Sequence, residues 1–494
     1  MDRGEKAQRS LAQWLKLLAI AVLILIALIA VTAWFARERI AGNLIDGYLE
    51  ESGLEATYDI IQIGPQRQVI ENLVIGEADA PDLVVKRIAI DVAYGLGAPQ
   101  IGSATLESPR LYGSFSGGKL SLGALDPLIF ADSEEASGLP AINVTIVDGG
   151  ARLDTDYGPV GAFLKGEGRL DDGFAGKLAV TAPNLAIEGC VAQTLTAYGD
   201  IRTSAGAPHF GGPVRLRGGE CGGVVLDRAD IAADLSTDAG FERFEARLGL
   251  SAGGLTYSDN SVANASGQAD IVFQESGLTL DHDVVLESIT TPYGRLASLT
   301  AGGALRRETA SARSDWRARI TGEGVDFSQV LGGALKQARA GSDGTLLGPL
   351  LAKLERNLGA ATRGGGLAAQ VTWRASEEQQ SFVIPEASLR SANGESVAAL
   401  SRVSWLSGGG ASGATGAGRL TGNFLIGGTG LPQINGRMER GGDGFLALRM
   451  AMAEYSAGDN AIALPNFSVR QEPGGSFLFS GALTASGALP GGSV

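Results

Sequence analysis

Apolar and polar side chains alternate along most of the chain. In residues 88–94, Ile88, Ile90 and Val92 alternate with Ala89 and Asp91. A period of two places successive side chains on opposite faces of a strand, which suits a sheet with one buried face. Similar runs recur at residues 73–75, 178–180, 195–201, 224–235, 246–250, 269–273, 278–286 and 477–483. The pattern predicts a mainly β protein.

Dipeptides that favour tight turns separate many of these runs. Asparagine or aspartate before glycine accepts the positive φ angles that hairpin turns require. Such pairs occur at Asp148-Gly149, Asp172-Gly173, Asn393-Gly394, Asn435-Gly436 and Asp443-Gly444. Glycine is abundant, at 73 of 494 residues, without the triplet period of collagen. We therefore expect a long antiparallel sheet that occupies residues 53–325 and 361–494.

Residues 326–360 interrupt this pattern with helical spacing. Asp326 can cap a first helix, whose apolar positions are 330, 331, 334 and 335. Residues 341–344 form a turn, and the leucines at 346, 347, 350, 351, 354 and 358 then repeat at helical spacing. Pro349 falls in the first turn of the second helix, where proline is tolerated. The spacing predicts a helical hairpin that lies against the sheet.

Residues 17–35 form an uncharged apolar run. A run of this length crosses a ~30 Å hydrocarbon layer as a helix. The cations Arg3, Lys6, Arg9 and Lys16 precede it, and only Arg37 and Arg39 follow closely. This bias predicts that residues 1–16 are cytoplasmic and that everything after residue 35 is outside the cytoplasm.

A cleaved signal peptide is the alternative for the same run. Val31-Thr-Ala33 has the small residues of a cleavage site. The length of the run and the aromatic pair Trp34-Phe35 favour a permanent transmembrane helix, because aromatic side chains anchor helices at membrane interfaces.

Residues 36–52 continue with an amphipathic helical pattern. Ile40, Leu44, Ile45, Tyr48 and Leu49 form one apolar stripe, and the opposite face is polar. This helix either lies on the membrane surface or plugs the end of the sheet that follows.

The composition excludes several kinds of function. The chain has 54 acidic and 40 basic residues and a formal net charge of −14. Nucleic acid is therefore an improbable partner, since its binding needs a basic surface. The two cysteines and two histidines of the chain leave almost nothing for thiolate or imidazole metal sites, which need about four ligands when they are structural. We expect no metal and no cofactor.

Two short motifs imitate catalytic ones. Residues 113–119 match a phosphate-binding loop, but Leu120 stands where a magnesium-binding Ser or Thr is needed, and a strand pattern follows. Residues 249–253 have the spacing of a nucleophile elbow around Ser251, but Gly254 follows and no helix begins. Both are expected to be glycine-rich turns.

Three further groups of residues have side chains of the kinds used in catalysis. Ser116 and Lys119, together with residues 258–260, resemble two penicillin-binding motifs, but no Lys-Thr-Gly occurs. In Asp281-His282-Asp283 the carboxylates and the imidazole point to opposite faces of a strand. His209 follows Pro208 without an evident partner, so both histidines are expected to be solvated. We predict no catalytic residue and a protein that is not an enzyme.

Several of these segments together resemble the AsmA-like superfamily, and the YdbH-type proteins most closely. The resemblance rests on the single N-terminal span and amphipathic helix, on residues 88–94 (IAIDVAY), 101–112 (IGSATLESPRLY) and 118–125 (GKLSLGAL). The strands at Gly189-Cys190 and Glu220-Cys221 and the leucine-rich hairpin are also similar. In that family a long sheet curls into an open groove, the β-taco, which spans the periplasm and passes phospholipids between the inner and outer membranes. The family's C-terminal portion is missing, so we expect the membrane-proximal part of a longer protein.

The resemblance implies partners and candidate sites. The partners would be phospholipid acyl chains, the inner membrane, and outer-membrane or periplasmic proteins. Ile88, Ile90 and Val92 share one face near the anchor and are the candidate lipid-facing residues. Cys190 and Cys221 each lie beside glycine at the edge of a strand, and an oxidising periplasm favours a disulfide between them. Two unpaired buried thiols are the alternative.

Other interpretations of the sheet remain open. Alternation alone also fits an ordinary sandwich or β-solenoid whose apolar face is packed core. A TamB-like periplasmic scaffold, which helps outer-membrane proteins or envelope integrity without moving lipid, is the second functional hypothesis. Dicarboxylate transport fits poorly, because one span and an acidic exterior give a dicarboxylate neither a path nor a counter-charge.

Overall fold

The computed structural model describes residues 55–64, 66–93, 100–117, 119–126, 139–187, 189–342, 344–376, 379–407, 418–441, 445–472, 475–489 and 492–493. The predicted cytoplasmic segment 1–16, transmembrane helix 17–35 and amphipathic helix 36–52 lie outside these residues, as does Asp443-Gly444. Within the described ranges, no helix combines the length and the apolar character that crossing a membrane requires.

The chain divides into two compact units, Met1–Ala252 and Gly253–Val494, and the division falls within strand β13. The elements of unit 1 are β1 (Ala56–Ile63), β2 (Arg67–Glu77), β3 (Ala80–Ala93), β4 (Gln100–Glu107), β5 (Arg110–Ser116), β6 (Lys119–Ser121), the 3-10 helix η1 (Gly123–Leu125), β7 (Asn143–Thr155), β8 (Gly158–Arg169), β9 (Ala175–Ile187), β10 (Cys190–Ser204), β11 (Ala207–Cys221), β12 (Val224–Thr237) and β13 (Arg243–Tyr257). The expected strand runs of this unit lie within these strands, except that residue 94 of the run 88–94 is outside the described residues.

Most neighbouring strands of unit 1 are antiparallel, as the alternation predicts. Strands β1 to β3 form one meander, and β7 to β12 form another. The antiparallel prediction is wrong at β7, which pairs in parallel with β4 and β5. A parallel pair needs a long return connection, and residues 122–142, which separate β6 from β7, supply it.

Unit 1 contains a packed hydrophobic core. Its largest fully buried side chains include Ile75, Leu111, Leu164 and Phe174. Complete burial of such a side chain contributes about 1.5–3 kcal/mol to folding. Burial of these side chains is therefore a main source of the stability of unit 1.

Cys190 and Cys221 are register partners at the ends of β10 and β11. Their Cα atoms lie 4.0 Å apart, and the structure joins their sulfur atoms.

We expect this pair to be oxidised in the natural protein. At a sequence separation of 31, closing the loop stabilises the fold by roughly 3–4 kcal/mol on the chain-entropy model. Thiol titration of the denatured protein without reductant should find no reactive thiol. Two reactive thiols would contradict the prediction.

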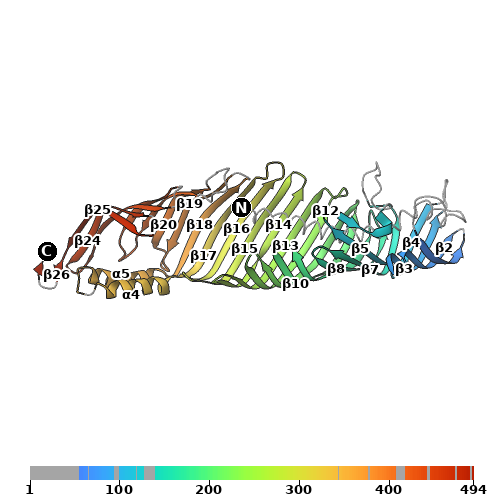
Figure 1. The fold of residues 1–494 in the computed structure, drawn as a ribbon, viewed down its shortest axis with the longest axis horizontal. Coiled ribbons are helices and arrows are strands. Elements are labelled where there is room, and N and C mark those ends of the chain that lie inside the picture. Colours follow the sequence, from blue (N-terminus) through green and yellow to red (C-terminus); the bar gives the residue numbers. More distant parts are fainter. Residues whose placement is uncertain are drawn as a thin grey trace. The chain divides into compact units, whose positions relative to one another are not determined.

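The elements of unit 2 are β14 (Asn260–Gln274), β15 (Gly277–Thr291), β16 (Gly294–Glu308), β17 (Ser314–Asp326), α4 (Ser328–Ala340), α5 (Leu347–Ala361), β18 (Arg363–Ala375), β19 (Gln380–Arg390), β20 (Ser396–Leu406), β21 (Arg419–Ile426), β22 (Ile434–Arg440), β23 (Leu446–Ala457), β24 (Asn460–Gln471), β25 (Phe477–Ser486), β26 (Ala488–Leu489) and β27 (Gly492–Ser493). Strands β14 to β25 form an uninterrupted antiparallel meander in chain order (Figure 1).

The two predicted helices are present as α4 and α5, between β17 and β18. They lie side by side along the ends of the strands (Figure 1). Pro349 lies in the first turn of α5, as expected. Asp326 does not cap α4: it ends β17, where Arg295 and Arg363 are its register partners and keep it extended. Phe327 takes the cap position without a side-chain hydrogen bond.

Two of the four described Asx-Gly pairs are not hairpin turns. Asp148 lies within β7 at a bulge, with φ 57°. The Arg110 guanidinium bonds to its carboxylate at 2.8 Å and holds the pKa of Asp148 below the usual range. Asn435-Gly436 lies within β22, and a Cβ on Gly436 would come within 2.4 Å of the Phe424 ring. Glycine therefore lets an aromatic ring lie across this strand.

Candidate functional site

One face of the unit 2 sheet is apolar from β14 to β24. Residues that are register partners share a face, so cross-strand rows can be followed from strand to strand. A central row consists of Gly267, Val284, Ala301, Ile320, Ala369, Ala387, Leu400, Phe424, Gly436, Met450 and Phe467. We call the face that contains this row the apolar face.

A second row of the apolar face is rich in aromatic side chains. It consists of Ile271, Leu280, Leu305, Trp316, Trp373, Phe382, Trp405, Leu420, Arg440 and Leu446. Its four aromatic members, Trp316, Trp373, Phe382 and Trp405, follow one another on β17, β18, β19 and β20. We call these four residues the aromatic row.

The apolar face is only partly covered. Ile320, Leu400 and Trp373 are half-buried, whereas the large core side chains of unit 1 are fully buried. Each methylene group that remains in water forgoes about 0.8 kcal/mol of burial energy. A continuous, half-exposed aliphatic surface is thus suited to bind an apolar ligand that is longer than one pocket.

The opposite face of the same strands is polar. On β17, the exposed side chains of Arg317, Arg319 and Thr321 alternate with Trp316, Ala318 and Ile320. The sheet of unit 2 therefore has one wet face and one apolar face, the arrangement that period-two alternation predicts.

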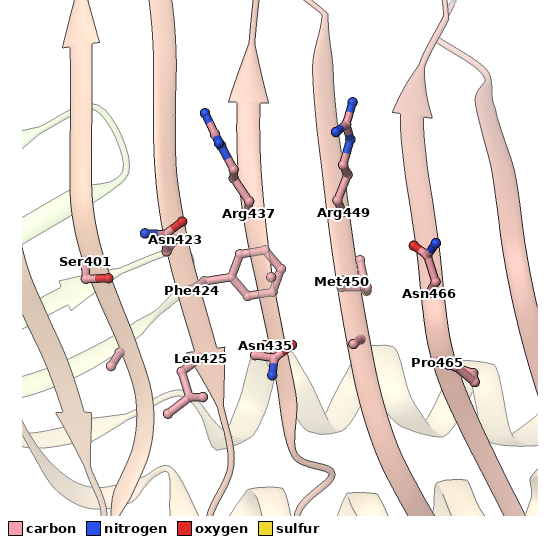
Figure 2. A pocket seen from close by; sticks show the side chains of 13 residues that line it. Ser401, Asn423, Phe424, Leu425, Asn435, Arg437, Arg449, Met450, Pro465 and Asn466 are labelled. Atoms are coloured by element: carbon pink, nitrogen blue, oxygen red, sulfur yellow. The ribbon is translucent and has the colours of Figure 1, made fainter.

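A shallow depression of about 580 Å³ lies on the polar side of β20 to β24. Its lining includes the register partners Asn423, Arg437 and Arg449. Figure 2 shows the two arginine side chains side by side and extended in the same direction. Arg437 is held by Glu439 at 2.8 Å. The lining also includes apolar residues, among them Leu425, Ala451 and Pro465.

Neither histidine is solvated as the sequence suggested. His282 lies on the apolar face, half-buried, and its Nε2 accepts a hydrogen bond from Trp316 Nε1 at 2.9 Å. Its neighbours Asp281 and Asp283 are exposed on the polar face, as the strand geometry predicts. His209 lies in β11, where its Nε2 is 3.2 Å from Asp234 and its Nδ1 accepts a hydrogen bond from Arg202.

Side chains of helix α5 donate hydrogen bonds to the loop before β22 and to the end of β23. Asn357 donates to the Gly430 carbonyl at 2.8 Å, and Lys353 donates to the Ser456 carbonyl at 2.6 Å. The Lys353 ammonium lies 4.8 Å from the centre of the Tyr455 ring. The Tyr455 hydroxyl also donates to the Gly430 carbonyl, at 3.1 Å, and burial raises the pKa of Tyr455.

The candidate lipid-facing residues of β3 lie in a more packed environment. Ile88 and Ile90 are half-buried, and Val92 is 8% exposed. Ile88 packs against the main core cluster of unit 1. Ala89, on the other side of the strand, is also buried at 5% exposure. A substitution here would disturb core packing as well as any lipid contact.

The first apparent catalytic motif is a tight turn, as expected: residues 113–116 belong to β5, Lys119 begins β6, and Ser116 and Lys119 are register partners. The turn expected at residues 249–253 is wrong, because Ser251 lies within β13. Among the described residues, no group of three or more His, Cys, Asp and Glu side chains could hold a metal ion.

The amino-acid sequence matches a known protein family over most of its length. The profile of the YdbH-like family, described as intermembrane phospholipid transport protein YdbH, matches residues 23–491. The chain belongs to the YdbH-like family. No curated protein and no solved structure gives a significant match.

Membership in the YdbH-like family confirms the resemblance seen in the sequence. It implies phospholipid transport, a role in the cell envelope and a lipid ligand. An extended apolar surface is what acyl chains require, and a lipid transport family does not imply a chemical reaction at this surface.

Sequence reasoning missed the aromatic row and the position of His282 within the apolar face. The four aromatic residues are spread over residues 316–405, so no local motif joins them. Each does occupy an apolar position of its own strand. Only the register between strands brings them into one row.

Proposed function

We propose that this protein is anchored in the inner membrane and carries phospholipids across the periplasm, with acyl chains on the apolar face of the sheet. The observation that carries the proposal is the continuity of the apolar face over β14 to β24 together with its half-buried state. Family membership supports phospholipid as the ligand.

The energetics favour such a ligand. Acyl chains gain about 0.8 kcal/mol for each methylene group that they bury, and the apolar face gains from being covered. The rows lie next to one another, and in the described part of the chain no closed pocket on this face would hold an acyl chain in one place. An acyl chain can therefore move from one row to the next without losing all of its contacts. The polar face meanwhile keeps the strands solvated.

Site-specific photocrosslinking in cells tests the proposal. A photoreactive amino acid at Ile320 or Leu400 should form covalent adducts with phospholipid. The neighbouring positions Thr321 and Ser401 are the matched controls, because both are exposed on the polar face. We expect lipid adducts at the first pair and few or none at the second.

The controls also separate this proposal from a scaffold function. A folded protein without lipid adducts at Ile320 and Leu400 would contradict transport and favour the TamB-like scaffold. Equal labelling of both faces would show non-specific contact with membranes and would also count against the proposal.

We propose further that Ile90 contacts lipid where the sheet begins, together with Ile88 and Val92. Because Ile88 packs against core residues, loss of activity in a substituted protein is informative there only when folding is measured in parallel. Ile320 and Leu400 are the sharper test positions.

A further inference from the structure

The two ends of the unit 2 strands differ in chemistry. We call the end beside α4 and α5 the hairpin end and the end at turns 275–276, 309–313 and 376–379 the polar end. At the hairpin end the apolar face is closed by packing: Ile289, Val325, Leu431 and Tyr455 are at most 8% exposed. A polar group has little access to the apolar face from that side.

At the polar end the last row of the apolar face contains polar side chains on β16, β17 and β19. The row consists of Phe273, Leu278, Arg307, Ser314, Ala375 and Gln380, which follow one another as register partners. Glu308 at the end of β16 and Arg313 in the turn that follows add further charge at this end. The polarity of the face therefore rises along the strands toward this end.

The aromatic row lies between these two environments. Trp316 and Trp373 each stand two residues from the polar row, and the central row, with Ile320 and Ala369, begins on their other side. Tryptophan and tyrosine prefer such boundaries in membranes, because the ring is apolar and its N–H or O–H needs a polar partner. Trp316 has such a partner in His282, which lies in the row of Ala318, between the aromatic row and the central row.

We infer that the aromatic row is the interfacial level of a phospholipid site, an inference that rests on the proposed function. The glycerol and ester region of the lipid lies at Trp316, Trp373, Phe382 and Trp405. The phosphate headgroup lies toward Arg307 and the polar end, and the acyl chains lie along the central row toward the hairpin end.

Brominated phospholipids test this orientation, because bromine quenches indole fluorescence only at short range. The chain has five tryptophans, and three of them belong to the aromatic row. In the full chain with Trp14→Phe and Trp34→Phe, all tryptophan fluorescence therefore comes from the aromatic row. It is loaded with phosphatidylethanolamine brominated either near the ester end or near the methyl end of its acyl chain. We expect the larger loss of fluorescence with ester-end bromine.

A deeper reporter provides the control. With all five tryptophans replaced by phenylalanine, Leu400→Trp places one indole in the central row on β20, the strand that also carries Trp405. The central row lies four residues from the aromatic row on β18, about 13 Å along the strand. The order of quenching should reverse, so that methyl-end bromine gives the larger loss. Circular dichroism and the amount of bound lipid are compared for both proteins.

Three other outcomes would each contradict a different part of the proposal. Larger quenching of the aromatic row by methyl-end bromine would reverse the orientation. Bound lipid that quenches neither reporter would place the lipid elsewhere and refute the interfacial level while leaving lipid carriage intact. A folded protein that takes up no lipid at all would refute the proposed function itself.

Discussion

Replacing Ile320 with aspartate is expected to abolish phospholipid transfer while the protein stays folded. Ile320 lies in the middle of the apolar face, and its register partners Ala301 and Ala369 offer no hydrogen bond to a carboxylate. An acyl chain that passes this point would have to cover an unpaired charge, at a cost of several kcal/mol. Because Ile320 is only half-buried, the cost to folding is smaller, on the order of 1–2 kcal/mol.

Thr321→Asp is the matched control, since it adds the same charge to the same strand on the exposed polar face. Two measurements are needed for each variant: resistance to proteolysis, and movement of pulse-labelled phospholipid between the two membranes. We expect loss of transfer in Ile320→Asp and near-normal transfer in Thr321→Asp. Normal transfer in a folded Ile320→Asp protein would show that lipid does not use this face.

The strand class and the helical hairpin could be predicted because both depend on local periodicity. A period of two identified strands in both units, and the leucines of residues 346–358 identified α5. Each of these patterns arises because one side of a single helix or strand is buried. No information about neighbouring elements is needed to recognise it.

The face to which each side chain belongs was harder to predict, because bulges change the alternation. At Ser288 and Arg402 the backbone has φ values of 53° and 51°. The apolar face accordingly passes from Leu286 to Ile289 and from Leu400 to Val403, three residues instead of two. Strict alternation would have placed Ser288 and Arg402 on the apolar face.

Long-range register explains the remaining errors. The parallel pairing of β7 depends on how the chain returns after residue 121, which local sequence does not determine. The partners of His209 come from β10 and β12, and the partner of His282 comes from β17. At Gly436, glycine is needed because the Phe424 ring on the adjacent strand packs closely against it. The Asn435-Gly436 pair therefore does not mark a turn, although its local sequence is typical of one.

The second large effect concerns the proposed membrane anchor at residues 17–35. We expect a reporter enzyme fused after Val494 to be active only if it is of a kind that works after export. The reason is the excess of cations before residues 17–35, which favours an N-terminus in the cytoplasm. The protein should also fractionate with the inner membrane and keep its N-terminal residues.

Replacing Arg3, Lys6, Arg9 and Lys16 with glutamine gives the matched test of the cause, because it removes the charge bias and leaves the apolar run intact. Export of the reporter should fall severalfold in this variant, and part of the protein should adopt the inverted orientation. An N-terminus that begins after Ala33 in the mature protein would identify residues 17–35 as a cleaved signal. Activity of a cytoplasm-only reporter in the unaltered chain would refute the topology, and with it lipid carriage through the periplasm.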